Sequence, residues 1–108
     1  MTMSFRAQLI DEAEHLHLYR VDLEGGTRVA HFVLDEKDEK IFESDSSGHP
    51  RQGGVLSIAS GEFSSPPKEG EGDEGGFRRE DFKSSAAHVA YQWKKEGRPP
   101  AEVIKYFG

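Results

Sequence analysis

The pair Gly25-Gly26, with an alternating run on each side between Leu16 and Leu34, constrains the fold of this chain more than any other feature. A two-glycine turn joins two antiparallel strands and fixes which of their residues face each other. If the two glycines form the loop, Leu23 lies opposite Arg28, and every earlier pair follows from that one. The sequence therefore predicts a β-hairpin of defined register, but it does not by itself indicate a reaction.

This register sorts the hairpin residues into two faces. One face is apolar and is expected to form the core: Leu23, Val21, Tyr19, Ala30, Phe32 and Leu34. The other face is too apolar for an ordinary solvated surface and too charged for a sealed interior, so it supplies candidate protein-interface residues. These candidates are Leu16, Leu18, Arg20, Asp22, Val29, His31 and Val33. A shift of one residue in register would exchange the two faces.

The segment before the hairpin fits two secondary structures. Apolar residues alternate with polar ones from Phe5 to Leu9, which indicates a strand, with residues 11–14 as the turn that leads to Leu16. Residues 5–14 also have helical spacing, and Ser4 is a suitable cap. A helix would place three acidic side chains at its unfavourable negative end, so we expect a strand.

The chain after Leu34 changes character twice. A polar turn at residues 35–38 precedes a fourth strand at Ile41-Phe42, which makes residues 4–44 an antiparallel meander. Residues 45–76 are rich in glycine, serine, proline and acidic side chains, with one possible short strand at 55–58. Residues 64–76 have too few apolar side chains to offset their ordering entropy, and we expect a mobile loop there.

The last third, residues 79–107, is predicted to be helical. Apolar residues recur at intervals of four, three and four, and Gly97 is placed to end the helix in a left-handed conformation. These apolar residues are Phe82, Ala86, Val89 and Trp93. Pro100 suits the first turn of a short terminal helix that would bury Val103, Ile104 and Phe107. The predicted fold is one α+β domain over residues 1–108: a meander of four to five strands, packed on one face by the helix.

The chemistry available to the chain is limited. It has no cysteine, which excludes disulfides, thiolate nucleophiles and cysteine zinc sites, and no serine lies in a Gly-x-Ser-x-Gly turn. The pair His15 and His17 has the spacing of two metal ligands on one side of a strand, but His31 falls on the other face and no third ligand can be placed. We therefore assign no catalytic, cofactor-binding or metal-binding residue, and no motif of a known family is evident.

Charge narrows the class of partner. The net charge is −6, and residues 1–44 carry ten acidic against five basic side chains. An acidic sheet repels phosphate backbones and attracts basic surfaces, so nucleic acid is not an expected partner. The last residues, 101–107, are too short and apolar for a DNA-recognition helix. There is no apolar run of membrane-spanning length and no secretion signal, so we expect neither membrane association nor export, but a cytoplasmic protein.

Two functions of different classes fit these features. The first is a small acidic, non-enzymatic protein-binding module, such as an inhibitor, an immunity-type protein or an accessory protein, that uses the mixed sheet face for a protein partner or a second copy. The alternative is a small enzyme or small-molecule carrier with a pocket between sheet and helix, in which His17, Tyr19 or His88 would supply polar groups. A third possibility is a subunit whose loop at 44–76 becomes ordered on a partner.

Overall fold

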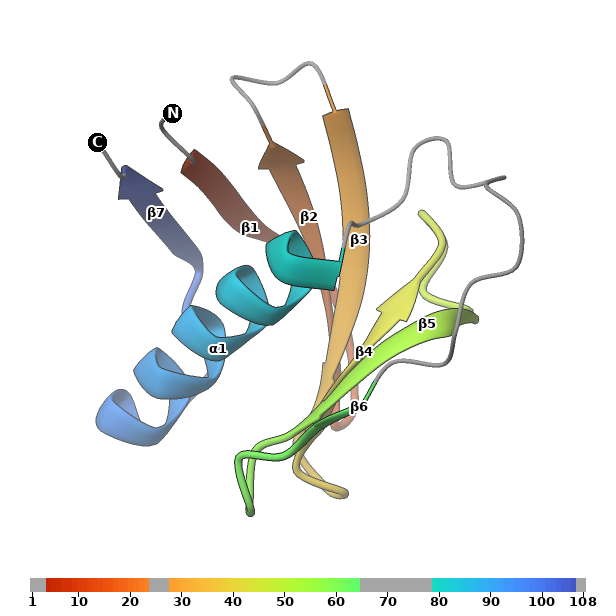
Figure 1. Ribbon diagram of the computed structural model, residues 1–108. Helices are drawn as coiled ribbons and strands as arrows, with labels where there is room; N and C mark the ends of the chain where they lie inside the picture. Colours follow the sequence, from red (N-terminus) through yellow and green to blue (C-terminus); the bar gives the residue numbers. More distant parts are fainter. Residues whose placement is uncertain (1–3, 24–27, 65–78, 107–108) are drawn as a thin grey trace.

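The computed structural model describes residues 4–23, 28–64 and 79–106, and within them seven strands form one antiparallel sheet that curves around a single helix (Figure 1). The sheet order is β6-β5-β4-β3-β2-β1-β7. The elements are β1 (Ser4–Ala13), β2 (Leu16–Leu23), β3 (Arg28–Asp35), β4 (Lys40–Ser44), β5 (Pro50–Ser57), β6 (Phe63–Ser64), α1 (Arg79–Glu96) and β7 (Glu102–Tyr106). The α+β class and the antiparallel sheet are confirmed, whereas the expected count of four to five strands was too low.

The hairpin register predicted from Gly25-Gly26 is confirmed in β2 and β3. Leu23 lies opposite Arg28, and every pair back to Leu16 opposite Asp35 follows without a shift. The glycine turn itself lies outside the described residues. The predicted core face is buried throughout: Val21, Leu23, Tyr19, Ala30, Phe32 and Leu34 are each at most 2 % exposed.

Residues 4–13 form a strand, so the helical alternative for this segment is wrong. The turn to β2 is shorter than predicted, because β1 continues to Ala13 and only Glu14, with a φ of 58°, and His15 make the turn. The register with β2 shifts between Leu9 and Asp11, which leaves Ile10 as the extra residue of a β-bulge. This bulge moves every residue after Ile10 to the opposite face from the one that simple alternation would give.

The segment expected to be mostly loop contains two strands. The predicted short strand at 55–58 is the end of the longer strand β5, and β6 pairs with it through Leu56 opposite Phe63. β5 pairs with β4, which supplies hydrogen-bond partners for the backbone of β5. The amino-acid composition of this segment alone did not indicate that pairing. Most of the predicted mobile loop at 64–76 lies outside the described residues.

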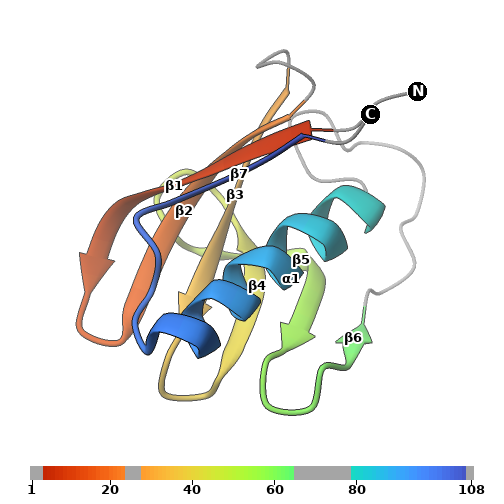
Figure 2. The same cartoon turned by 90° about the vertical axis from the view of Figure 1, so that its left-hand side faces the viewer.

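The long helix packs its predicted stripe against the inner face of the sheet (Figure 2). Phe82, Ala86 and Val89 are fully buried, and Trp93 is partly buried against the same core. Gly97 ends the helix as predicted: its φ is 78°, and its N–H donates a 2.8 Å hydrogen bond to the carbonyl of Trp93.

The predicted terminal helix at residues 101–107 is wrong. Glu102–Tyr106 form the strand β7, which pairs antiparallel with β1 and so brings the two ends of the described chain side by side (Figures 1 and 2). The spacing of apolar residues in this short segment is compatible with a strand as well as a helix. In the strand, Val103 is buried while its neighbour Ile104 is 44 % exposed. Backbone pairing with β1 decides between the two.

Among the described residues, no helix combines the length and the apolar character that crossing a membrane requires.

Candidate functional site

The candidate site lies on the outer face of the sheet, defined as the face turned away from α1. The hairpin register and its extension to β1 place all seven predicted interface residues on this face: Leu16, Leu18, Arg20, Asp22, Val29, His31 and Val33. Cross-strand neighbours extend the face on β1, where Arg6 lies opposite Asp22 and Gln8 opposite Arg20. The outer face is therefore a continuous surface over at least the three strands β1, β2 and β3 and not a property of the hairpin alone.

Two of the predicted residues are less accessible than the hairpin suggested. Leu18 is 8 % and Val33 2 % exposed, although the helix lies on the other side of the sheet. The cover comes from the turn between β4 and β5: a Cβ built on Gly48 would stand 3.9 Å from a methyl carbon of Leu18 and 4.0 Å from one of Val33. The turn folds across the outer face and leaves only part of this apolar patch open.

Asp45 holds this covering turn in shape. Its Oδ1 accepts hydrogen bonds from the backbone N–H groups of Ser47, at 2.8 Å, and His49, at 3.0 Å. These backbone donors favour the ionised carboxylate and lower the pKa of Asp45 from its ordinary value. The turn closes further through a 3.0 Å hydrogen bond from the N–H of Gly48 to the carbonyl of Asp45.

Beside the turn, the outer face is hollowed to a volume of about 100 Å³, here called the outer hollow. Leu16, Leu18 and Val33 supply its apolar lining, so three of the seven predicted residues meet there. The remaining lining comes from Asp11, Glu12, Ala13, Ser47 and Gly48. The outer hollow thus combines aliphatic side chains with the acidic side chain of Asp11, whereas the carboxylate of Glu12 contacts His17 on the inner face.

Asp11 is the residue of this site that sequence reasoning missed. The sequence predicts a turn at residues 11–14, whereas the bulge at Ile10 places Asp11 in β1 directly opposite Leu18. The exposed Asp11 carboxylate accepts a 2.9 Å hydrogen bond from the N–H of Glu12, and no cation in the described part of the chain lies within ion-pair distance of it. The consecutive apolar residues Leu9 and Ile10, which interrupt the alternation, were the available signal of the bulge.

The basic side chains of the outer face are already paired. Arg6 Nε lies 2.6 Å from an oxygen of Glu102, and Arg20 Nε lies 3.1 Å from Oδ1 of Asp22. His31 is partly buried beside Arg20, and burial first, then the guanidinium charge, lower its pKa from the ordinary value. The face therefore has internally matched charges near β7, β1 and β2, and an unmatched carboxylate at the outer hollow.

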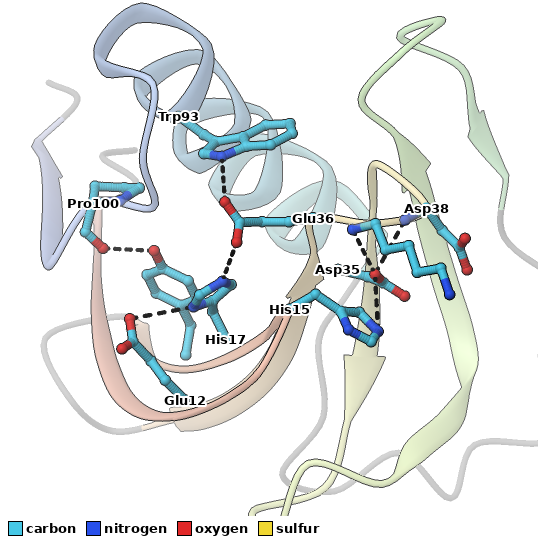
Figure 3. A network of polar contacts seen from close by, with 10 residues as sticks. Glu12, His15, His17, Asp35, Glu36, Asp38, Trp93 and Pro100 are labelled. Atoms are coloured by element: carbon cyan, nitrogen blue, oxygen red, sulfur yellow. Dashed lines mark hydrogen bonds and ion pairs between the residues drawn. The ribbon is translucent and has the colours of Figure 1, made fainter.

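A second polar cluster lies on the inner face, at the end of the sheet nearest the last turns of α1 (Figure 3). The buried imidazole of His17 has Nδ1 3.2 Å from a Glu12 oxygen and Nε2 2.8 Å from Oε1 of Glu36. Trp93 Nε1 donates a 3.2 Å hydrogen bond to the other oxygen of Glu36. The cluster joins β1, β2, the turn after β3 and the helix, which indicates a structural role.

Tyr19 belongs to the same end of the inner face. Its fully buried hydroxyl donates a 2.5 Å hydrogen bond to the carbonyl of Pro100, in the segment between α1 and β7 (Figure 3). Burial, with smaller contributions from the charges of Glu12 and Glu36, raises the pKa of Tyr19 well above its ordinary value. The phenol is therefore a fixed hydrogen-bond donor and not a general base at neutral pH.

The structure separates the histidine pair that the sequence singled out. His15 Nε2 lies 3.7 Å from Oδ1 of Asp35, whereas His17 contacts Glu12 and Glu36 (Figure 3). Within residues 4–23, 28–64 and 79–106, no group of three or more His, Asp or Glu side chains is arranged to hold a metal ion. His88, which with His17 was proposed for an internal pocket, contacts the carbonyl of Ser84 at 2.8 Å.

Comparisons of the chain with models of protein families, with curated proteins and with solved structures gave no match.

Proposed function

We propose that this protein is a small non-enzymatic protein-binding module, of the inhibitor, immunity or accessory kind, whose outer sheet face receives a basic side chain of its partner. The observation that carries the proposal is the exposed carboxylate of Asp11 in the lining of the outer hollow, for which the described residues supply no cationic partner. The proposal has three supports: the size of the outer hollow, its chemistry and the charge of the chain.

The size of the outer hollow suits one side chain. Sites for drug-sized molecules and cofactors usually measure about 300–1,000 Å³, whereas the outer hollow measures about 100 Å³. A protein partner would fill it with one residue and cover the flanking strands with its own surface. Burial of such an anchoring side chain is a common source of affinity in protein interfaces.

The chemistry of the outer hollow fits lysine or arginine. These side chains have an aliphatic stem, which Leu16 and Leu18 would contact, and a cationic end, which Asp11 would bind. A purely apolar residue would leave the carboxylate without a cationic partner, and an acidic residue would be repelled by it. The lining therefore favours basic residues over both alternatives.

The charge of the whole chain supports the same partner. A net charge of −6 attracts a basic surface over a longer range and raises the rate of encounter. On the flanking part of the outer face, the Arg20–Asp22 and Arg6–Glu102 pairs provide matched charges for the polar rim of an interface.

The alternative of a ligand pocket between sheet and helix has less support. Side chains fill that space: Tyr19, Phe32 and Phe82 are fully buried, and a Cβ added at Gly54 would stand 2.6 Å from a ring carbon of Phe82. The polar groups that such a pocket would use are engaged within the fold, as with Tyr19 and Pro100.

A peptide-display selection tests the proposal. Immobilised protein is used to select from a random peptide library, and we expect the selected peptides to be enriched in lysine or arginine at one position. Asp11→Asn should abolish that enrichment, whereas the matched control Asp38→Asn, which changes an exposed carboxylate outside the outer hollow, should retain it. Enrichment of apolar or acidic peptides, or the same basic peptides with Asp11→Asn, would overturn the proposal.

A further inference from the structure

The two edges of the sheet differ in length. Within the described residues, β6 at one edge has two residues, whereas β7 at the other edge has five, from Glu102 to Tyr106, and β1 is its one neighbour in the sheet. A sheet edge presents unpaired N–H and C=O groups that can pair with another chain, and very short edge strands limit this risk. The β7 edge lacks that protection, and no proline or register shift interrupts it.

The hydrogen-bond pattern shows which groups of β7 are free. The N–H of Leu9 donates a 2.9 Å hydrogen bond to the carbonyl of Ala101, so the odd-numbered residues of this ladder are the ones bonded to each other. In antiparallel pairing the bonded residues alternate, and each residue directs its N–H and C=O to the same side. The backbone groups of Glu102, Ile104 and Tyr106 therefore point away from β1, along the outer edge.

We propose that the β7 edge pairs with β7 of a second copy of this chain, antiparallel and centred on Ile104, so that the two sheets form one continuous sheet. With Ile104 opposite Ile104 of the second copy, Glu102 lies opposite Tyr106 and Tyr106 opposite Glu102. In each copy, the backbone groups of Glu102, Ile104 and Tyr106 are then hydrogen-bonded to the other copy. The three N–H groups of each copy give six interchain hydrogen bonds in total.

The side chains fit this register. Ile104 is 44 % exposed on the outer face and would lie against its own copy across the two-fold axis, which buries an apolar side chain that the monomer leaves in water. The register also keeps the two Glu102 carboxylates apart. Centring the ladder on Glu102 would instead place like charges directly opposite each other and would leave most of the edge unpaired.

A second copy is the favoured partner of this edge because β7 is complementary to itself. The antiparallel register bonds all the free backbone groups and brings the two Ile104 side chains together. This site is separate from the outer hollow: β7 lies at the end of the sheet order, beyond β1, whereas the outer hollow is lined from β1, β2, β3 and the turn after β4. Self-pairing and the binding of a basic partner are therefore independent and can fail independently.

Charge substitutions at Ile104 test the pairing by sedimentation velocity on the full chain. The wild type should shift with rising concentration from 12.1 kDa toward twice that mass. Ile104→Lys and Ile104→Glu should each raise the dissociation constant at least about tenfold, because each places like charges face to face. An equimolar mixture of the two variants should recover a dimer, because the register then pairs lysine with glutamate.

Ile10→Lys is the matched control, since Ile10 is an isoleucine exposed to a similar degree, 48 %, and lies outside the pairing of β1 with β7. It should leave self-association unchanged. Amide exchange gives a second readout: in concentrated protein, the amides of Ile104 and Tyr106 should gain protection that dilution removes, while those of Val103 and Lys105 stay protected by β1. A monomer at every concentration, a dimer lost in Ile10→Lys, or no recovery in the mixture would overturn the proposal.

Discussion

The indole Nε1 of Trp93 donates a 3.2 Å hydrogen bond to Oε2 of Glu36 and so ties the last turn of α1 to the turn between β3 and β4. The other oxygen of Glu36 lies 2.8 Å from the buried imidazole of His17. His17 also contacts Glu12, so the cluster connects the β1–β2 hairpin, the turn after β3 and the helix. The cluster fixes the end of the helix relative to the sheet.

We expect His17→Ala to lower the free energy of unfolding by about 1–3 kcal/mol, because the substitution removes both contacts and leaves a gap at a buried position. Urea denaturation measures this loss. His49→Ala is the control, since His49 is 79 % exposed and should change stability by less than about 0.5 kcal/mol. Equal effects of the two substitutions would contradict a structural role for His17.

Tyr19→Phe should destabilise the junction between α1 and β7. The substitution removes the 2.5 Å hydrogen bond to the carbonyl of the buried Pro100 and leaves that acceptor without its partner, at a cost of about 1–3 kcal/mol. Amide exchange should show the largest loss of protection at Val103 and Lys105, just after Pro100. Uniform loss across the sheet would mean that Tyr19 stabilises the fold as a whole and not this junction.

Gly54→Ala should be destabilising although glycine is usually unfavourable in a strand. The new Cβ would stand 2.6 Å from a ring carbon of Phe82 and 3.1 Å from one of Phe63, and such overpacking typically costs about 1–3 kcal/mol. Thermal unfolding measures the loss. In a Phe82→Leu background the same Gly54→Ala change should cost less, and an undiminished cost there would point to a backbone effect.

Asp45 should make the stability depend on acid pH. Its pKa is lowered in the folded protein from an ordinary value of 3.8, so the unfolded state binds its proton first as the pH falls. The stabilisation is therefore complete above about pH 4 and is lost as the pH falls through the folded-state pKa. Asp45→Asn keeps an oxygen acceptor without the charge, and its unfolding free energy should approach that of the wild type at low pH. A stability difference that does not change with pH would contradict this assignment.

The parts of the fold predicted correctly are those in which neighbours in sequence are neighbours in space. Gly25-Gly26 and the alternation on either side of it defined the β2–β3 register, and the spacing from Phe82 to Trp93 defined the buried side of α1. Both patterns depend on local geometry, which the residue order records directly.

The errors come from contacts between distant segments. Residues 102–106 have apolar spacing compatible with a helix, and only pairing with β1, almost a hundred residues earlier, makes them a strand. The burial of Leu18 and Val33 depends on the turn that contains Gly48, and the position of Asp11 depends on the bulge at Ile10. The outer hollow is lined by residues from β1, β2, β3 and the turn after β4. The sequence therefore indicated the sheet face on which it lies, but not the shape of the hollow.

The central claim is that the outer hollow binds a basic side chain, and an NMR titration with N-acetyl-lysine N-methylamide tests it most directly. The lysine probe should give intermolecular NOEs to the methyl groups of Leu18 and Leu16 and should shift the Asp11 amide. The norleucine analogue, or the lysine probe with Asp11→Asn, should bind about two- to fivefold more weakly, as expected for an exposed ion pair. Equal binding of the lysine and norleucine probes, or shifts located elsewhere on the protein, would contradict the claim.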